Sequence, residues 1–135
     1  MFIYSNKKKN KILGVLHRSK KISNKRNNIS PINEYLQISS QKLKKGDYIN
    51  PHVHLKNKRI IFSTQEAWFV LKGKLSVKIF DIDKKNIKNL ILNKGDIYVF
   101  FCGGHSFKVL SNNAEFYEIK NGPYQKNVKD IKYFK

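Results

Sequence analysis

Hydrophobic residues fall in short runs along most of this chain, and no segment keeps the 3.6-residue repeat of a helix. From residue 35 onward the runs are rich in Ile, Val, Phe and Tyr and are separated by Gly, Asn, Asp and Lys, which is typical of β-strands joined by tight turns. The pattern therefore predicts an all-β fold, a small barrel or jelly roll. The predicted strands are Tyr35–Leu43, Ile49–His54, Ile60–Phe62, Ala67–Leu71, Leu75–Phe80, Ile87–Leu92, Ile97–Phe101, Ser106–Leu110 and Ala114–Ile119.

The first 30 residues differ from the rest, because many lysines are scattered there among Asn and Ser and only Ile12–His17 has the pattern of a strand. We expect residues 1–30 to form a basic, partly ordered arm, residues 31–125 to form the barrel, and residues 126–135 to be a C-terminal tail. A tail that binds nucleic acid is the alternative interpretation of the arm.

The charge of the chain is strongly positive: 28 Lys and Arg against 9 Asp and Glu give a formal net charge of +19. Such a charge is typical of proteins that bind polyanions. Only three of the basic residues are Arg, however, and Asn and Ile are also abundant, which favours an AT-rich coding bias over selection for phosphate recognition. Nucleic acid is therefore the less favoured partner, although small anions are still attracted.

The single cysteine, Cys102, excludes a disulfide framework. No run approaches the ~18 apolar residues of a membrane-spanning helix, and the N-terminus lacks the ~7–15-residue apolar block of a signal peptide. We therefore expect one cytoplasmic domain with no membrane contact.

Three of the four histidines occur in informative contexts. His52 and His54 lie two apart in a predicted strand, so both imidazoles share one face and are able to reach one metal ion, but a solvated pair is equally compatible with the pattern. Glu66 opens an otherwise apolar strand, where it is either a carboxylate paired with a cation or a solvated rim residue. His105 follows a Gly-Gly turn.

The spacing of these residues resembles the two motifs of the cupin superfamily. The first motif corresponds to Gly46, His52, His54, Glu66 and Gly73, and the second to Gly95, Gly103 and His105. The resemblance implies a small cupin jelly-roll β-barrel with a divalent metal, Fe, Mn, Ni, Co or Zn, held by His52, His54, Glu66 and His105. The segment between His54 and Glu66 is longer than in the family pattern, Phe101 replaces the usual proline, and His105 comes one residue early.

A narrower likeness joins Gly103–Phe107 and Glu118–Tyr124 to small bacterial cupins found with the enzymes of surface-polysaccharide and modified-sugar biosynthesis. It implies a carbohydrate or nucleotide-sugar context and, as in many cupins, a homodimer. Three residues become acid–base candidates through this resemblance: Tyr48, Glu118 and Lys120.

Three further residues are candidates for substrate binding. Trp68 shares the face of Glu66 and either stacks on a sugar ring or belongs to the core. Gln37 lies on a polar strand face that turns either inward or toward solvent. Arg59, in the lengthened segment, either binds a carboxylate or phosphate or is an exposed loop cation.

Two functional hypotheses follow from these residues. In the first, the chain is a metal-dependent enzyme that isomerises or epimerises a sugar-related metabolite by proton transfer. In the second, it is an accessory protein that binds a metal or a sugar without turning it over. Nucleic-acid binding through the basic arm is the third interpretation.

Overall fold

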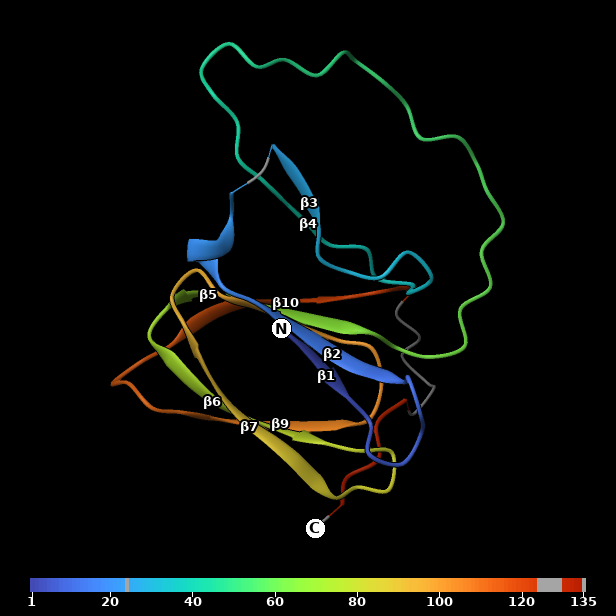
Figure 1. Ribbon diagram of the computed structural model, residues 1–135, viewed down its shortest axis with the longest axis vertical. Helices are drawn as coiled ribbons and strands as arrows, with labels where there is room; N and C mark the ends of the chain where they lie inside the picture. Colours follow the sequence, from blue (N-terminus) through green and yellow to red (C-terminus); the bar gives the residue numbers. More distant parts are fainter. Residues whose placement is uncertain (24, 124–129, 135) are drawn as a thin grey trace.

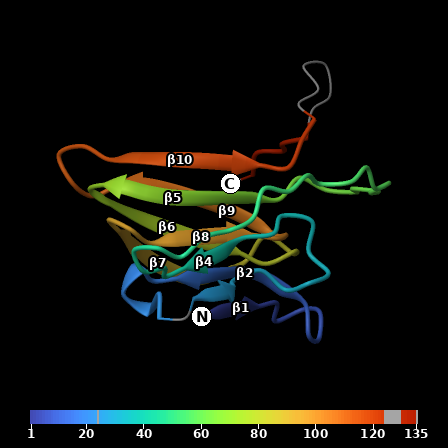
Figure 2. The ribbon, with the colours of Figure 1, turned by 90° about the horizontal axis from the view of Figure 1, so that it is seen from above.

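Two antiparallel sheets face each other across a shared core in the computed structural model of the chain (Figure 1; Figure 2). The structure describes residues 1–23, 25–123 and 130–134. The larger sheet has five strands in the order β1-β2-β8-β5-β10, and the smaller has three in the order β7-β6-β9. The strands of the larger sheet are β1 (Phe2–Tyr4), β2 (Ile12–His17), β8 (Ile97–Phe100), β5 (Glu66–Lys72) and β10 (Glu115–Lys120). Those of the smaller sheet are β7 (Asn86–Asn93), β6 (Lys74–Phe80) and β9 (Gly104–Val109).

The core lies between the two sheets and is built by alternation along each strand. In β6, the inward residues Leu75, Val77 and Ile79 are at most 1% exposed, whereas their neighbours are exposed or half-buried. They pack against Trp68 and Val70 of the opposite sheet. The predicted two-residue period therefore sets the buried face of this strand.

The chain passes from the larger sheet to the smaller at Gly73, between β5 and β6. Gly73 has a φ of +77°, and a Cβ there would collide with the carbonyl oxygen of Asn113. Because glycine alone meets both demands without strain, this position fixes the corner of the sandwich.

The outer face of the larger sheet is also covered. The short strands β3 (Arg26–Asn28) and β4 (Ser39–Gln41) pair with each other, and Ile29, Leu36 and Ile38 pack over this face. The central strands are therefore buried on both faces, which explains why they are apolar almost throughout.

The N-terminal segment is more ordered than the sequence suggested. It supplies β1, β2 and the 3-10 helix η1 (Ser19–Lys21), and Leu13 and Leu16 are buried in the core. The expected strand Ile12–His17 forms as β2 and pairs with β8 in the middle of the sheet, so this stretch of residues 1–30 belongs to the larger sheet rather than to a separate arm.

Two predicted strands do not form. Ile49–His54 and Ile60–Phe62 lie in an extended segment where every residue from 41 to 64 is exposed (Figure 1). The first run contains Pro51, which has no N–H for a strand ladder. Of the predicted strand Tyr35–Leu43, only Ser39–Gln41 is a strand, while the other six predicted strands appear with small shifts at their ends.

The sheets are not closed into a barrel in the part of the chain that the structure describes. The smaller sheet ends at β9 and the larger at β10, so both are edge strands. The all-β class is confirmed, and the sandwich stays open on one side because residues 42–65 add no strand. The predicted boundary between residues 125 and 126 lies outside the described residues, as does Tyr124. None of the described residues forms a helix of the length and hydropathy needed to cross a membrane.

The packing of β2 gives a stability prediction. Leu13 is 0% exposed, so Leu13→Ala removes buried methyl groups and should lower the free energy of unfolding by about 2–5 kcal/mol in urea denaturation. Ile82→Ala, at a side chain that is 50% exposed, should change it by less than about 0.5 kcal/mol. Equal effects of the two substitutions would show that the N-terminal segment is not packed in the core.

Candidate functional site

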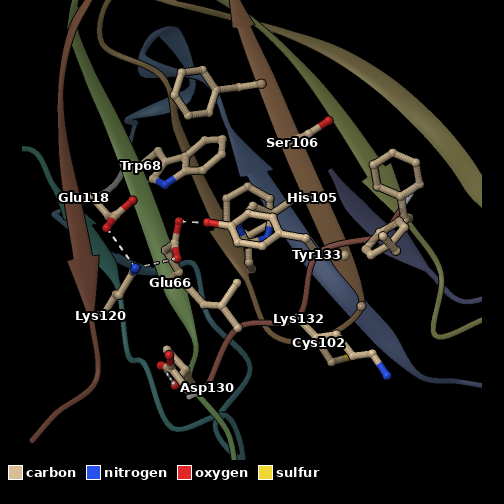
Figure 3. A pocket seen from close by; sticks show the side chains of 18 residues that line it. Glu66, Trp68, Cys102, His105, Ser106, Glu118, Lys120, Asp130, Lys132 and Tyr133 are labelled. Atoms are coloured by element: carbon tan, nitrogen blue, oxygen red, sulfur yellow. Dashed lines mark hydrogen bonds and ion pairs between the residues drawn. The ribbon is translucent and has the colours of Figure 1, made fainter. Parts of the chain in front are cut away.

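A pocket of about 610 Å³ lies where β9 of the smaller sheet approaches β5 and β10 of the larger (Figure 3). Its volume falls in the range typical of small-molecule sites, ~300–1,000 Å³. The polar and aromatic side chains on which the chemistry depends are Glu66, Trp68, His105, Phe107, Glu118 and Lys120.

Strand register brings these side chains together. Glu66 and Trp68 are two residues apart in β5 and therefore share one face. On the neighbouring strand β10, Lys120 is directly opposite Glu66, and Glu118 is directly opposite Trp68. His105 comes from the other sheet, on the second residue of β9, so the pocket joins the two layers at their open side.

Glu66 is the centre of the polar cluster. Its side chain is nearly buried, with Oε1 3.5 Å from His105 Nε2 and Oε2 3.3 Å from Lys120 Nζ. Burial alone would raise the pKa of Glu66, but the hydrogen bond and charge of His105, together with the charge of Lys120, outweigh burial and lower it. Glu66 is therefore held as a carboxylate.

Lys120 bridges two carboxylates. Its Nζ lies 2.9 Å from Glu118 Oε1 as well as 3.3 Å from Glu66 Oε2. The hydrogen bond to Glu118, followed by the charge of Glu66, raises the pKa of Lys120 above its ordinary value. The ammonium group is thus fixed in place and stays charged.

Aromatic rings form the second wall of the pocket. The Trp68 ring centroid lies 4.7 Å from that of Phe100, 5.1 Å from that of His105 and 5.0 Å from that of Phe107. His105 also lies against Phe100, at 4.1 Å between centroids. The imidazole is therefore held by rings on two sides, with one nitrogen at Glu66.

A C-terminal segment lines the mouth. Phe134 lies edge-on to Phe80 at 5.2 Å, and a Cβ on Gly104 would come within 2.7 Å of the Phe134 ring. Asp130 accepts a hydrogen bond from Thr64 at 3.0 Å. No motif in the sequence points to these residues, and their one signal is Gly104, the glycine that leaves room for the ring.

Cys102 also lines the pocket, but it is a packed thiol. Its Sγ donates a weak hydrogen bond to the Ile12 carbonyl at 3.4 Å, and burial raises the pKa of Cys102. A nucleophilic thiolate is therefore disfavoured at this position.

Five of the predicted site residues lie elsewhere. His52, His54, Tyr48 and Arg59 are all on the exposed segment of residues 41–64, outside the pocket. Gln37 is exposed and donates to the carbonyls of Pro31 and Glu34, so its polar face turns outward. By contrast, Glu66, Trp68, His105, Glu118 and Lys120 are together in one pocket (Figure 3).

The predicted four-residue metal centre is not assembled in this structure. The ring centroids of His52 and His54 are 5.4 Å apart, but Glu66 and His105 do not lie beside this pair. Among the described residues, no group of three or more His, Cys, Asp or Glu side chains could hold a metal ion. At Glu66, the ammonium group of Lys120 supplies the positive charge that a bound metal ion would otherwise supply. The residues as arranged do not fit the metal that the cupin resemblance implies.

Comparisons with known proteins add no assignment: no protein-family model, curated protein or solved structure matches this chain. The site is therefore interpreted from its geometry.

The lowered pKa of Glu66 predicts a dependence of stability on pH. A carboxyl group whose pKa is lower in the folded than in the unfolded chain stabilises the fold above its unfolded value, about 4.5, and this contribution disappears as the pH falls through the folded value. In Glu66→Gln, the free energy of unfolding, measured in urea, should therefore fall less steeply with acidification below pH 4.5 than in the wild type. Glu115→Gln removes an exposed charge of the same strand pair and should keep the wild-type slope. A Glu66→Gln variant with an unchanged slope would contradict this pairing.

The placement of the histidines gives a second prediction. Any Ni²⁺ or Zn²⁺ binding, measured by calorimetry on untagged chain, should weaken in His52→Ala and His54→Ala and stay unchanged in His105→Ala, because His105 is not joined to that pair. Parallel loss of binding in all three variants would show that the exposed segment closes over Glu66 and His105, and that the predicted four-residue centre exists.

Proposed function

We propose that this chain is a small jelly-roll protein of the cupin kind that binds a sugar-related metabolite in the pocket and moves a proton on it. The observation that carries the proposal is the contact of His105 Nε2 with Glu66 Oε1, at 3.5 Å, inside a pocket with aromatic walls. Such a pairing of imidazole and carboxylate is the usual arrangement of a general base and its orienting partner.

The aromatic wall supports a carbohydrate ligand. Sugar rings present a flat apolar face to an indole or phenyl ring and hydroxyl groups to carboxylates and ammonium groups. Phe107, which is 46% exposed, supplies the accessible ring and Trp68 packs behind it, while Glu118 and Lys120 supply an acceptor and a donor beside them. The pocket volume of about 610 Å³ is also in the range of sites that bind small molecules.

Proton transfer then follows from the residues present. When Nε2 donates its N–H to Glu66, Nδ1 keeps its lone pair and is the nitrogen that takes a proton. His105 takes this proton from a carbon next to the sugar carbonyl, and the electron pair moves onto the carbonyl oxygen. Lys120 keeps Glu66 ionised, and Glu66 stabilises the imidazolium that forms. Return of the proton by His105 to the former carbonyl carbon, while the hydroxyl proton passes to the former carbonyl oxygen, gives the isomer.

No step is routed through a metal, because the described residues do not bring the four predicted ligands together. Because the proton moves between carbons of one molecule, the overall oxidation state of the sugar does not change and the reaction needs no oxidant or reductant.

Deuterium exchange tests the catalytic proposal. The chain is incubated in deuterated water with a panel of sugars and nucleotide sugars, and deuterium at a sugar carbon is measured by mass spectrometry. The wild type should introduce deuterium into one member of the panel, and His105→Ala should reduce the rate by about 10²-fold or more.

Glu115→Gln, on the same strand as Glu118 but outside the pocket, is the matched control and should keep the wild-type rate. Absence of exchange across the whole panel, with binding retained, would overturn the catalytic proposal and leave an accessory protein that binds sugars.

A further inference from the structure

The pocket has the opposite charge balance to the chain as a whole. The chain carries a formal charge of +19, but the described residues lining the pocket include three carboxylates and only two lysines. The carboxylates are Glu66, Glu118 and Asp130, and the lysines are Lys120 and Lys132. A ligand inside the pocket therefore meets a net negative surface, although anions are attracted to the molecule from a distance.

Lys120 offers little to an anionic ligand. Its ammonium group already lies within 3.3 Å of Glu66 and 2.9 Å of Glu118, so a phosphate would have to displace a carboxylate. One ammonium is shared by two carboxylates, so this group of three keeps a negative charge, and Glu118, the more exposed of the two carboxylates, presents it to a ligand. That position suits a cation, since the exposed side of the Glu118 carboxylate attracts positive charge.

An unpaired donor adjoins the same carboxylate. The Trp68 side chain is 2% exposed, and its Nε1 has no hydrogen-bond partner among the residues that the structure describes. Trp68 and Glu118 are direct partners across β5 and β10, and Figure 3 shows the indole nitrogen on the side of Glu118. A buried N–H without a partner is costly, and a ligand oxygen that accepts from it removes this cost.

We infer that the pocket selects a sugar bearing a protonated amino group over one bearing a phosphate, with Glu118 and Trp68 as the residues that determine this specificity. The amino group pairs with the Glu118 carboxylate, and a neighbouring hydroxyl oxygen accepts from Trp68 Nε1. This inference rests on the proposed function, since it names the substrate class of the same pocket.

The experiment uses Trp68, the single tryptophan of the chain, as its reporter. The indole N–H resonance of the full chain is followed by NMR while glucosamine, glucose and glucose 6-phosphate are added separately, below neutral pH and at matched ionic strength. The resonance should shift at the lowest concentration with glucosamine, then glucose, and at the highest with glucose 6-phosphate.

Two variants locate the preference. Glu118→Gln should weaken glucosamine binding by roughly two- to fivefold more than it weakens glucose binding, because the amide still accepts a hydroxyl hydrogen bond but no longer forms the partly exposed ion pair with the amino group. Glu115→Gln makes the same charge change on β10 outside the pocket and should leave both affinities unchanged.

The outcomes separate the two proposals. Glucose 6-phosphate binding as tightly as glucosamine, or a preference for glucosamine that survives Glu118→Gln, would overturn the inference and leave sugar binding intact. An indole resonance that none of the three sugars moves would overturn the proposed function together with the inference.

Discussion

A nearly buried carboxylate requires hydrogen-bonding or charged partners beside it, and Glu66 has one from each sheet. Lys120 comes from the neighbouring strand of the larger sheet, and His105 comes from the edge strand of the smaller sheet. Without these partners, the cost of removing a carboxylate from water would favour its protonation. The charge of Glu66 therefore depends on how the two sheets meet, and the pocket exists where they meet.

The unequal sheets explain why the pocket lies at this place. Hydrophobic burial between the sheets is continuous under β6, where Leu75 and Val77 are 0% exposed. Toward the edge strands β9 and β10, the layer of apolar side chains between the sheets ends. Polar side chains of β5 and β10 lie there instead. The rings of Trp68, Phe107 and Phe116 fill the gap between the two edge strands, with Phe107 and Phe116 centroids 5.5 Å apart. Polar chemistry is thus confined to one end of the open side.

Local alternation of hydrophobic residues was enough to predict the strands that build the core, and the same alternation placed Trp68 on the face of Glu66. It failed for Ile49–His54, because alternation does not say whether a run finds a partner strand, and Pro51 weakens the run as a ladder member. It did predict the strand Ile12–His17, but not that this strand pairs with β8 in the middle of the sheet. Pairing partners are long-range information that a single run does not contain.

The candidate site was predictable only in part, because it too depends on which segments lie beside each other in the fold. Glu66 and His105 are together as the motif spacing implied, and Lys120 and Glu118 were found through the same resemblance. The two histidines at residues 52 and 54 were predicted on a strand and lie instead on an exposed segment. The C-terminal segment at the mouth carries no pattern of its own, since a contact between Phe134 and Gly104 depends on the whole fold.

A direct test of the central ion-pair cluster is an NMR titration of the Glu66 side-chain carboxyl resonance in the wild type and in Lys120→Met. The account predicts a wild-type midpoint below the ordinary value of 4.5 and a higher midpoint in the variant. A wild-type midpoint at or above 4.5, or one that Lys120→Met does not move, would contradict it.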